Sequence, residues 1–124
     1  SDPTGTWDKY ILSVGEAPTM DASFFGEAST LGVDGNGVYV GMTIVRSTGG
    51  STSSIFATPI ASLLGQTPSL GTLFAFTQLT EFFGPPQPAH NQDAVTPSSR
   101  AWFVGSSSSI FGNVNFRSIT WTAG

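Results

Sequence analysis

Residues 31–45 read LGVDGNGVYVGMTIV, and this stretch decides the fold class. Its centre, DGNG at 34–37, contains an Asp-Gly and an Asn-Gly pair, which supply the positive φ angles of a tight hairpin turn. Beyond the turn every second residue is apolar, as in a strand that packs one face against a core. The stretch therefore predicts a β-hairpin with arms at 31–33 and 38–45. The apolar face of the second arm consists of Val38, Val40, Met42 and Ile44.

Most of the remaining chain continues this β pattern. Runs of alternating or clustered apolar residues predict further strands at 6–14, 100–105, 110–111 and 114–122. Stretches rich in Gly, Ser and Thr predict loops at 15–28 and 46–54 and a turn at 106–109. We expect Phe24 and Phe25 to anchor the first of these loops to the core.

The middle of the chain carries the only helix signal. Thr58 and Pro59 form an N-cap followed by proline at the first helical position, and Gly65 ends the pattern, so a short helix is predicted at 59–64. Residues 73–80 are compatible with a helical face, but their Phe and Thr content favours a strand.

The last predicted strand has apolar side chains on both faces. Ile119 and Trp121 lie on one face, and Val114 and Phe116 lie on the other. Such a strand is either buried on both faces or covered by a partner.

These patterns predict one all-β domain over residues 1–124, a sandwich or barrel of about seven to nine short strands with a short helix near 59–64. Four prolines between 84 and 99, without apolar periodicity, predict a long loop or arm there. The chain length is sufficient for one hydrophobic core.

Charge is scarce: 10% of the residues are charged, against about 25% in ordinary soluble domains. With a net charge of −4 and scattered basic residues, the sequence excludes a basic patch for nucleic acid and disfavours binding to anionic membranes. A polar surface with few charges favours association with other protein. The basic residues are Lys9, Arg46, Arg100 and Arg117.

No motif assigns a reaction to this chain. The single histidine, His90, lies in the proline-rich segment with Asp93 nearby, where no rigid element would fix a catalytic or metal-binding pair. Nucleophile-elbow and phosphate-binding motifs are absent, and there is no cysteine. We therefore expect neither an enzyme nor a bound cofactor or metal.

The residues that remain as candidates suit an interface. Trp7 and Trp121 lie near the two chain ends, where an aromatic side chain is often exposed, and the proline-rich arm could lie in a groove of a neighbour at low entropic cost. The candidate interface residues are Trp7, Pro85, Pro86, Pro88, His90 and Trp121.

Two short stretches and the composition resemble phage proteins. GNGVYVG at 35–41 and ITWT at 119–122 resemble repeat fragments of phage tail-associated β-propellers. The Cys-free, lysine-poor, Ser/Thr/Gly-rich composition resembles small bacteriophage virion proteins, either head-decoration (cement) proteins or minor tail and fibre domains. The resemblance carries no functional residues across.

These observations lead to a ranked hypothesis. We expect a non-enzymatic phage structural protein, a capsid decoration or cement protein on the outer capsid lattice. Its partners would be the major capsid protein and further copies of itself, for example in a trimer. The alternative is a glycan- or receptor-binding module of a tail or fibre, and the third reading is a small β-barrel enzyme.

The expected location is the virion, after synthesis in the host cytoplasm. The start of the chain, SDPTG at 1–5, is polar and shows no signal peptide, and no apolar run is long enough to span a membrane.

Overall fold

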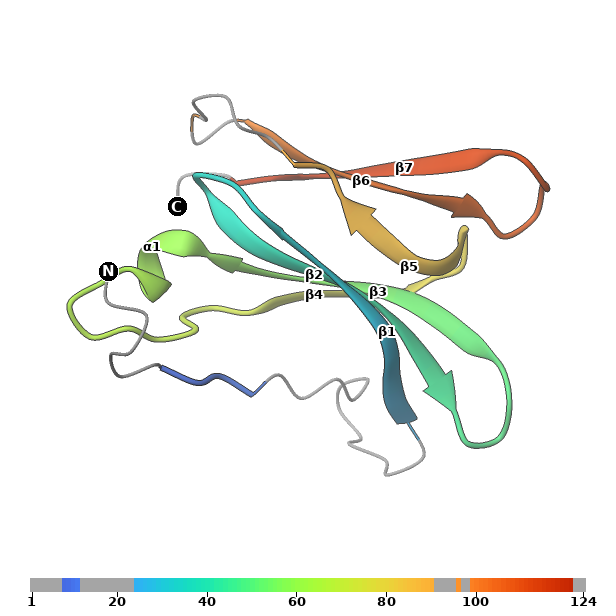
Figure 1. Ribbon diagram of the computed structural model, residues 1–124, viewed down its shortest axis with the longest axis horizontal. Coiled ribbons are helices and arrows are strands. Elements are labelled where there is room, and N and C mark those ends of the chain that lie inside the picture. The colour runs from blue at the N-terminus through green and yellow to red at the C-terminus, as the bar shows by residue number, and fades with distance from the viewer. Residues whose placement is uncertain (1–7, 12–23, 91–95, 97–98, 122–124) are drawn as a thin grey trace.

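Two antiparallel sheets pack face to face in the computed structural model, which describes residues 8–11, 24–90, 96 and 99–121 (Figure 1). One sheet has the order β1-β2-β3-β4 and the other β5-β6-β7. The predicted all-β fold with one short helix is confirmed, and of the two predicted architectures, sandwich or barrel, the described strands form the sandwich. The elements are β1 (Phe24–Val33), β2 (Gly37–Arg46), β3 (Ser51–Pro59), α1 (Ile60–Leu63), β4 (Phe74–Leu79), β5 (Phe82–Pro88), β6 (Arg100–Ser107) and β7 (Val114–Thr120).

The predicted hairpin is the β1–β2 hairpin, and a carboxylate shapes its turn. The Asp34 side chain accepts hydrogen bonds from the N–H groups of Asn36 and Gly37 at 2.8 and 2.9 Å. The Asp34 N–H donates to the Gly37 carbonyl at 3.0 Å and closes the turn. Local turn chemistry thus fixes the register of the first two strands.

The first arm of this hairpin begins earlier than expected, and the strand that follows the hairpin, β3, was not predicted. The predicted loop at 15–28 is wrong from Phe24 onward, because β1 passes through a bulge at Ala28, whose φ of 45° shifts the register by one residue. The predicted loop at 46–54 is wrong from Ser51 onward, because these polar residues pair regularly with β2.

The other local predictions divide between those confirmed and those not. Helix α1 and strand β4 are confirmed. A strand was predicted at 6–14, but residues 8–11 do not form one. The other residues of that prediction lie outside the described part of the chain. The predicted strand at 110–111 is instead the β6–β7 turn, closed by the Asn113 N–H on the Ile110 carbonyl.

The predicted proline-rich arm at 84–99 is wrong at its start, because 84–88 belong to β5. Proline gives a strand no N–H, and the β5–β6 ladder is interrupted between Phe83 and Gln87. Hydroxyl groups of the opposite sheet bind the β5 carbonyls instead. Thr30 donates to the Pro86 carbonyl at 2.6 Å, and Ser53 donates to the Gly84 carbonyl at 2.7 Å.

Glycine allows this close approach of the two sheets. A Cβ added at Gly41 would lie 1.8 Å from the Pro86 carbonyl oxygen, and one at Gly32 would lie 2.3 Å from the Pro88 Cβ. Pro86 and Pro88 are therefore buried between the sheets. The adjoining core cluster consists of Tyr39, Ile55, Ala57, Ala101 and Phe103.

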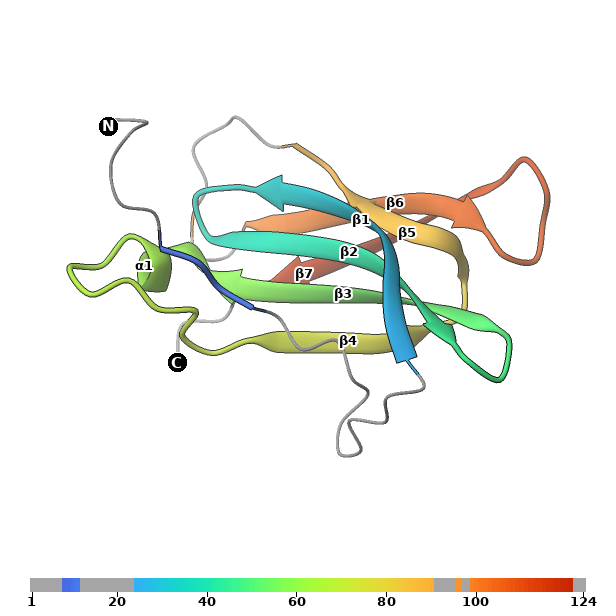
Figure 2. The ribbon, with the colours of Figure 1, turned by 60° about the horizontal axis from the view of Figure 1, so that its bottom comes forward.

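The two sheets differ in how their outer faces are covered. Residues 8–11 run across the outside of the four-stranded sheet (Figure 2). Tyr10 lies there beside Val40 and Phe56, and Phe56 is buried. The face of the β5-β6-β7 sheet that points away from the four-stranded sheet carries large exposed apolar side chains instead.

Candidate interaction surface

Strand register places a set of large apolar side chains on one face of the β5-β6-β7 sheet. Phe83 pairs with Ser106, and Ser106 pairs with Val114, so these three residues form one row across the sheet. The next rows are Gln87-Val104-Phe116 and Trp102-Ser118. We call the face that presents these rows the outer face.

The outer face is exposed although it is apolar. Phe83 is 78% exposed, Phe116 61%, Val114 57% and Trp102 45%. The β6–β7 turn adds the exposed Phe111 next to Val114. Large contiguous apolar patches are uncommon on monomeric proteins and mark interaction sites.

Charge is almost absent from the outer face. The Arg100-Thr120 pair continues the rows at one end of the sheet, and Arg100 is the one charged side chain on the outer face among the described residues. Its guanidinium lies 6.0 Å from the Trp102 ring. A partner that covers the remainder of the face would therefore desolvate no charge of this chain.

The outer face is hollowed at the β6–β7 turn. The hollow has a volume of about 640 Å³ and is lined by Phe83, Phe111, Asn113, Val114 and the serines of 106–109. This volume lies within the range of about 300–1,000 Å³ of small-ligand sites. Aromatic rings beside an amide and hydroxyls suit either an inserted protein side chain or a sugar.

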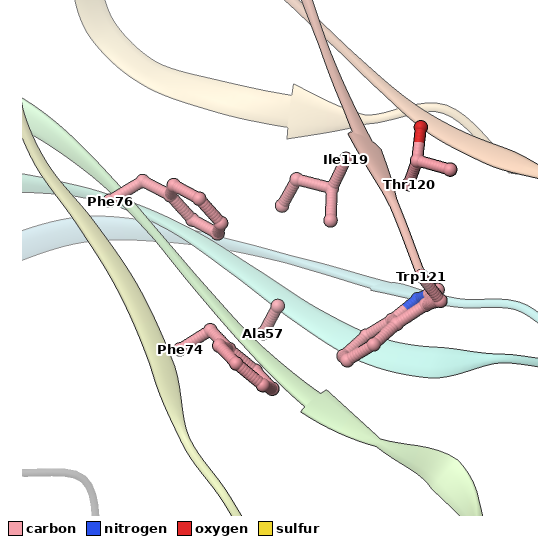
Figure 3. Close-up of a pocket in the computed structure, with 6 residues that line it drawn as sticks. All are labelled: Ala57, Phe74, Phe76, Ile119, Thr120 and Trp121. Atoms are coloured by element: carbon pink, nitrogen blue, oxygen red, sulfur yellow. The ribbon is translucent and has the colours of Figure 1, made fainter. Parts of the chain in front are cut away.

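A second, smaller cleft opens between the sheets at the edges of β4 and β7. Figure 3 shows Phe74 and Phe76 on one side and Ile119 and Trp121 on the other, with Ala57 at the base. The Phe74 and Trp121 rings pack edge to face at 5.6 Å, and the cleft volume is about 110 Å³. The cleft is thus a gap at the side of the core and is too small for a drug-sized ligand.

Trp121 connects this side of the sandwich to the hairpin turn. Its indole N–H donates to the Tyr39 hydroxyl at 2.7 Å, and the Tyr39 hydroxyl donates to the Asp34 carboxylate at 3.0 Å. Burial raises the pKa of the Tyr39 phenol above its usual range; the hydrogen bond from Trp121 opposes this, and the hydrogen bond and charge of Asp34 add to it. The network therefore holds a neutral phenol between an indole and a carboxylate.

The candidate interface residues from the sequence do not lie together on one surface. Pro86 and Pro88 are buried under the opposite sheet and are not free for a partner, because the glycines across from them let β5 seat closely. Pro85 is half-buried, and Trp121 packs on Tyr39.

His90 is exposed, and it lines a polar hollow at the end of β6 with Arg100 and Trp102. Trp7 and Asp93 lie outside the described residues. Within the described ranges no cluster of three His, Cys, Asp or Glu residues could hold a metal ion. In the same part of the chain no helix has the length and apolar content needed to cross a membrane.

One sequence pattern indicated part of the outer face, namely the apolar residues on both faces of the last predicted strand. That pattern had two explanations, burial on both faces of the sheet or cover by a partner. Val114 and Phe116 are exposed in the structure, so burial on both faces is wrong for these residues. Phe83 and Trp102 could not be added from the sequence, because only strand register brings them beside β7.

Comparison with protein-family models, curated proteins and solved structures found no match.

Proposed function

We propose that this protein is a non-enzymatic structural protein that docks onto other protein through the outer face of its β5-β6-β7 sheet. The observation that carries the proposal is the exposure of Phe83, Val114 and Phe116 in adjoining rows of one sheet. The cores of protein interfaces are rich in aromatic residues and poor in charge, and the outer face has both properties.

The energetics of covering this face favour a protein partner. Burying one exposed Phe contributes about 1.5–3 kcal/mol. Phe83 and Phe116 together would therefore stabilise a complex by about 3 kcal/mol or more, before the other contacts are counted. Apart from Arg100 the face has no charge to desolvate, so the main opposing term is the entropy of association, which the two Phe side chains and the other contacts must offset together.

Within this class we propose a bacteriophage virion protein that decorates the outer capsid lattice, with the major capsid protein as its partner. The support is the resemblance in composition to small virion proteins, joined to the low charge of the docking face. In a subunit bound to a lattice, the neighbouring protein covers this face. The face therefore does not need charges to keep the protein soluble.

The test uses virus particles that lack this protein. The purified chain is added to such particles, which are then sedimented, and the bound fraction is measured. We expect stoichiometric binding, and a Phe83→Ser/Phe116→Ser variant should bind about 100-fold more weakly. The matched control is Phe25→Ser, which removes an exposed Phe from β1 and should bind normally. Equal binding by both variants would refute the docking face.

A specific observation also favours the second candidate, a glycan- or receptor-binding module of a tail or fibre. The hollow at the β6–β7 turn places Phe83 and Phe111 beside Asn113, so that aromatic rings and an amide line the same space, as a sugar ring could use for stacking and hydrogen bonding. Screening against immobilised glycans separates the two proposals. Retention that is lost in Asn113→Ala, without particle binding by the wild type, would replace the first proposal with this one.

A further inference from the structure

The four edge strands of the sandwich differ in how they discourage pairing with another strand. Edge strands of soluble proteins usually carry bulges, prolines or charges for this purpose. β1 has its bulge at Ala28, with φ 45°, and β4 contains Gln78 at φ 57° next to a register shift. β5 contains Pro85, Pro86 and Pro88.

β7 has neither a bulge nor a proline, and the one charge that it carries, Arg117, is paired within the chain. Its seven residues contain neither Pro nor Gly, none has a positive φ, and its register with β6 runs without a shift. Its other side is an edge among the described strands. β7 is therefore the one edge strand of the described sandwich that remains suited to further pairing.

The hydrogen-bond pattern shows which backbone groups point to that open edge. The Ser107 N–H donates to the Asn113 carbonyl at 2.9 Å at the start of the β6–β7 hairpin. Because hydrogen-bonded and non-hydrogen-bonded pairs alternate along an antiparallel ladder, the odd-numbered residues of β7 bond to β6. The N–H and C=O groups of Val114, Phe116 and Ser118 therefore point outward.

The only charge on β7 is neutralised within the chain. The Arg117 Nε donates to the Glu81 carboxylate at 2.5 Å, and the Asn115 amide donates to the Glu81 backbone carbonyl at 2.6 Å. Partial burial acts to raise the pKa of Glu81, but the hydrogen bonds and the charge of Arg117 outweigh it and lower that pKa below its ordinary value. The edge thus presents no net charge to an approaching strand.

We infer that β7 pairs antiparallel with β7 of a second copy of this chain, around a two-fold axis at Phe116. In this register Phe116 lies opposite Phe116 of the second copy, and Val114 lies opposite Ser118 of the second copy. All three outward-pointing residues then exchange backbone hydrogen bonds. A register centred one residue later would lose this aromatic cross-strand pair, because Phe116 would then lie opposite Ser118 of the second copy.

The inferred pairing explains why a second copy fits this edge. A two-fold interface uses the same surface on both partners, and this strand is self-complementary in hydrogen bonding and presents no net charge. The two three-stranded sheets become one six-stranded sheet, which joins the two outer faces at an aromatic cross-strand pair of Phe116 residues. The inference rests on the edge of the sheet and does not depend on the proposed function.

The first test measures mass by light scattering across a dilution series. The wild type should change from 12.9 kDa to twice that mass as the concentration rises. Ser118→Pro removes an outward N–H and leaves the β6–β7 ladder intact, so it should fold and associate at least tenfold more weakly. Ser118→Ala keeps the N–H and should match the wild type.

Three outcomes of this measurement would overturn the inference. They are a wild type that stays monomeric at every concentration, a Ser118→Pro variant that dimerises as well as Ser118→Ala, and a closed trimer that Ser118→Pro leaves unchanged. Circular dichroism of each variant confirms that the sandwich is retained.

The second test fixes the register and benefits from a chain without cysteine. Opposed Cα atoms of a hydrogen-bonded pair are about 5.5 Å apart, within disulfide range, so Phe116→Cys should form a cross-linked dimer on mild oxidation. Ser118→Cys is the matched control, because the two copies of residue 118 would lie about 13 Å apart along the strands. Cross-linking of Phe116→Cys should be at least tenfold faster, and equal rates would contradict the register.

Discussion

Gly41→Ala tests how closely the two sheets approach. The added Cβ would lie 1.8 Å from the Pro86 carbonyl oxygen and 2.6 Å from the Thr30 hydroxyl. An ordinary C···O contact is about 3.3–3.6 Å, so β5 would have to move outward by about 1.5 Å. Overpacking of this kind costs about 1–3 kcal/mol, and the Thr30–Pro86 hydrogen bond contributes about 1 kcal/mol more. We expect a loss of about 3 kcal/mol in the free energy of unfolding.

Urea unfolding followed by circular dichroism and tryptophan fluorescence measures this loss, with an unchanged m-value as the sign that only stability has changed. Gly65→Ala is the matched control, because its Cβ would lie 3.7 Å from the nearest atom, the Ala61 carbonyl oxygen. It should be neutral or stabilise the fold by up to about 1 kcal/mol. A Gly41→Ala protein within about 0.5 kcal/mol of wild type would show that β5 is not seated on β2 as described.

Three further substitutions test other parts of the fold. Tyr39→Phe should lower the free energy of unfolding by about 2–3 kcal/mol, because Asp34 loses a donor to its charge. Because the pKa of Tyr39 is raised in the fold, the native state holds the phenol proton more tightly than the unfolded chain does. The free energy of unfolding of the wild type should therefore fall as the pH rises above about 10. The same rise in pH should lower the free energy of unfolding of Tyr39→Phe by less. Phe103→Ala, at a fully buried ring, should cost about 3–5 kcal/mol in urea unfolding. Arg117→Ala should cost less than about 1 kcal/mol, because Arg117 is exposed and Glu81 is only partly buried, and a larger loss would mean that this ion pair supports the monomer fold.

The parts of the fold predicted from the sequence depend on local interactions. The turn at 34–37 was predictable because its hydrogen bonds join residues two or three positions apart. β5 was missed because its prolines argue locally against a strand, while the groups that bind its carbonyls, Thr30 and Ser53, lie 56 and 31 residues away. Such long-range partners leave no periodic trace in a single sequence.

The candidate surface shows the same division. The two-sided pattern of β7 left open burial on both faces or cover by a partner. The candidates chosen from the proline-rich segment and from the chain end, such as Pro86 and Trp121, are buried or packed within the sandwich. The outer face depends on the register of three strands, and the open edge depends on which strand ends the sheet. Neither property can be obtained from the alternation of residues within one strand.

The open edge of β7 should be the site where a second copy of this chain extends the β5-β6-β7 sheet. Residue-resolved amide hydrogen exchange of the wild type at low and high concentration tests this pairing. We expect the amides of Val114, Phe116 and Ser118 to exchange rapidly in dilute protein and to become protected as the concentration rises, while those of Asn115 and Arg117 are protected throughout. Rapid exchange of the first group at every concentration would contradict it.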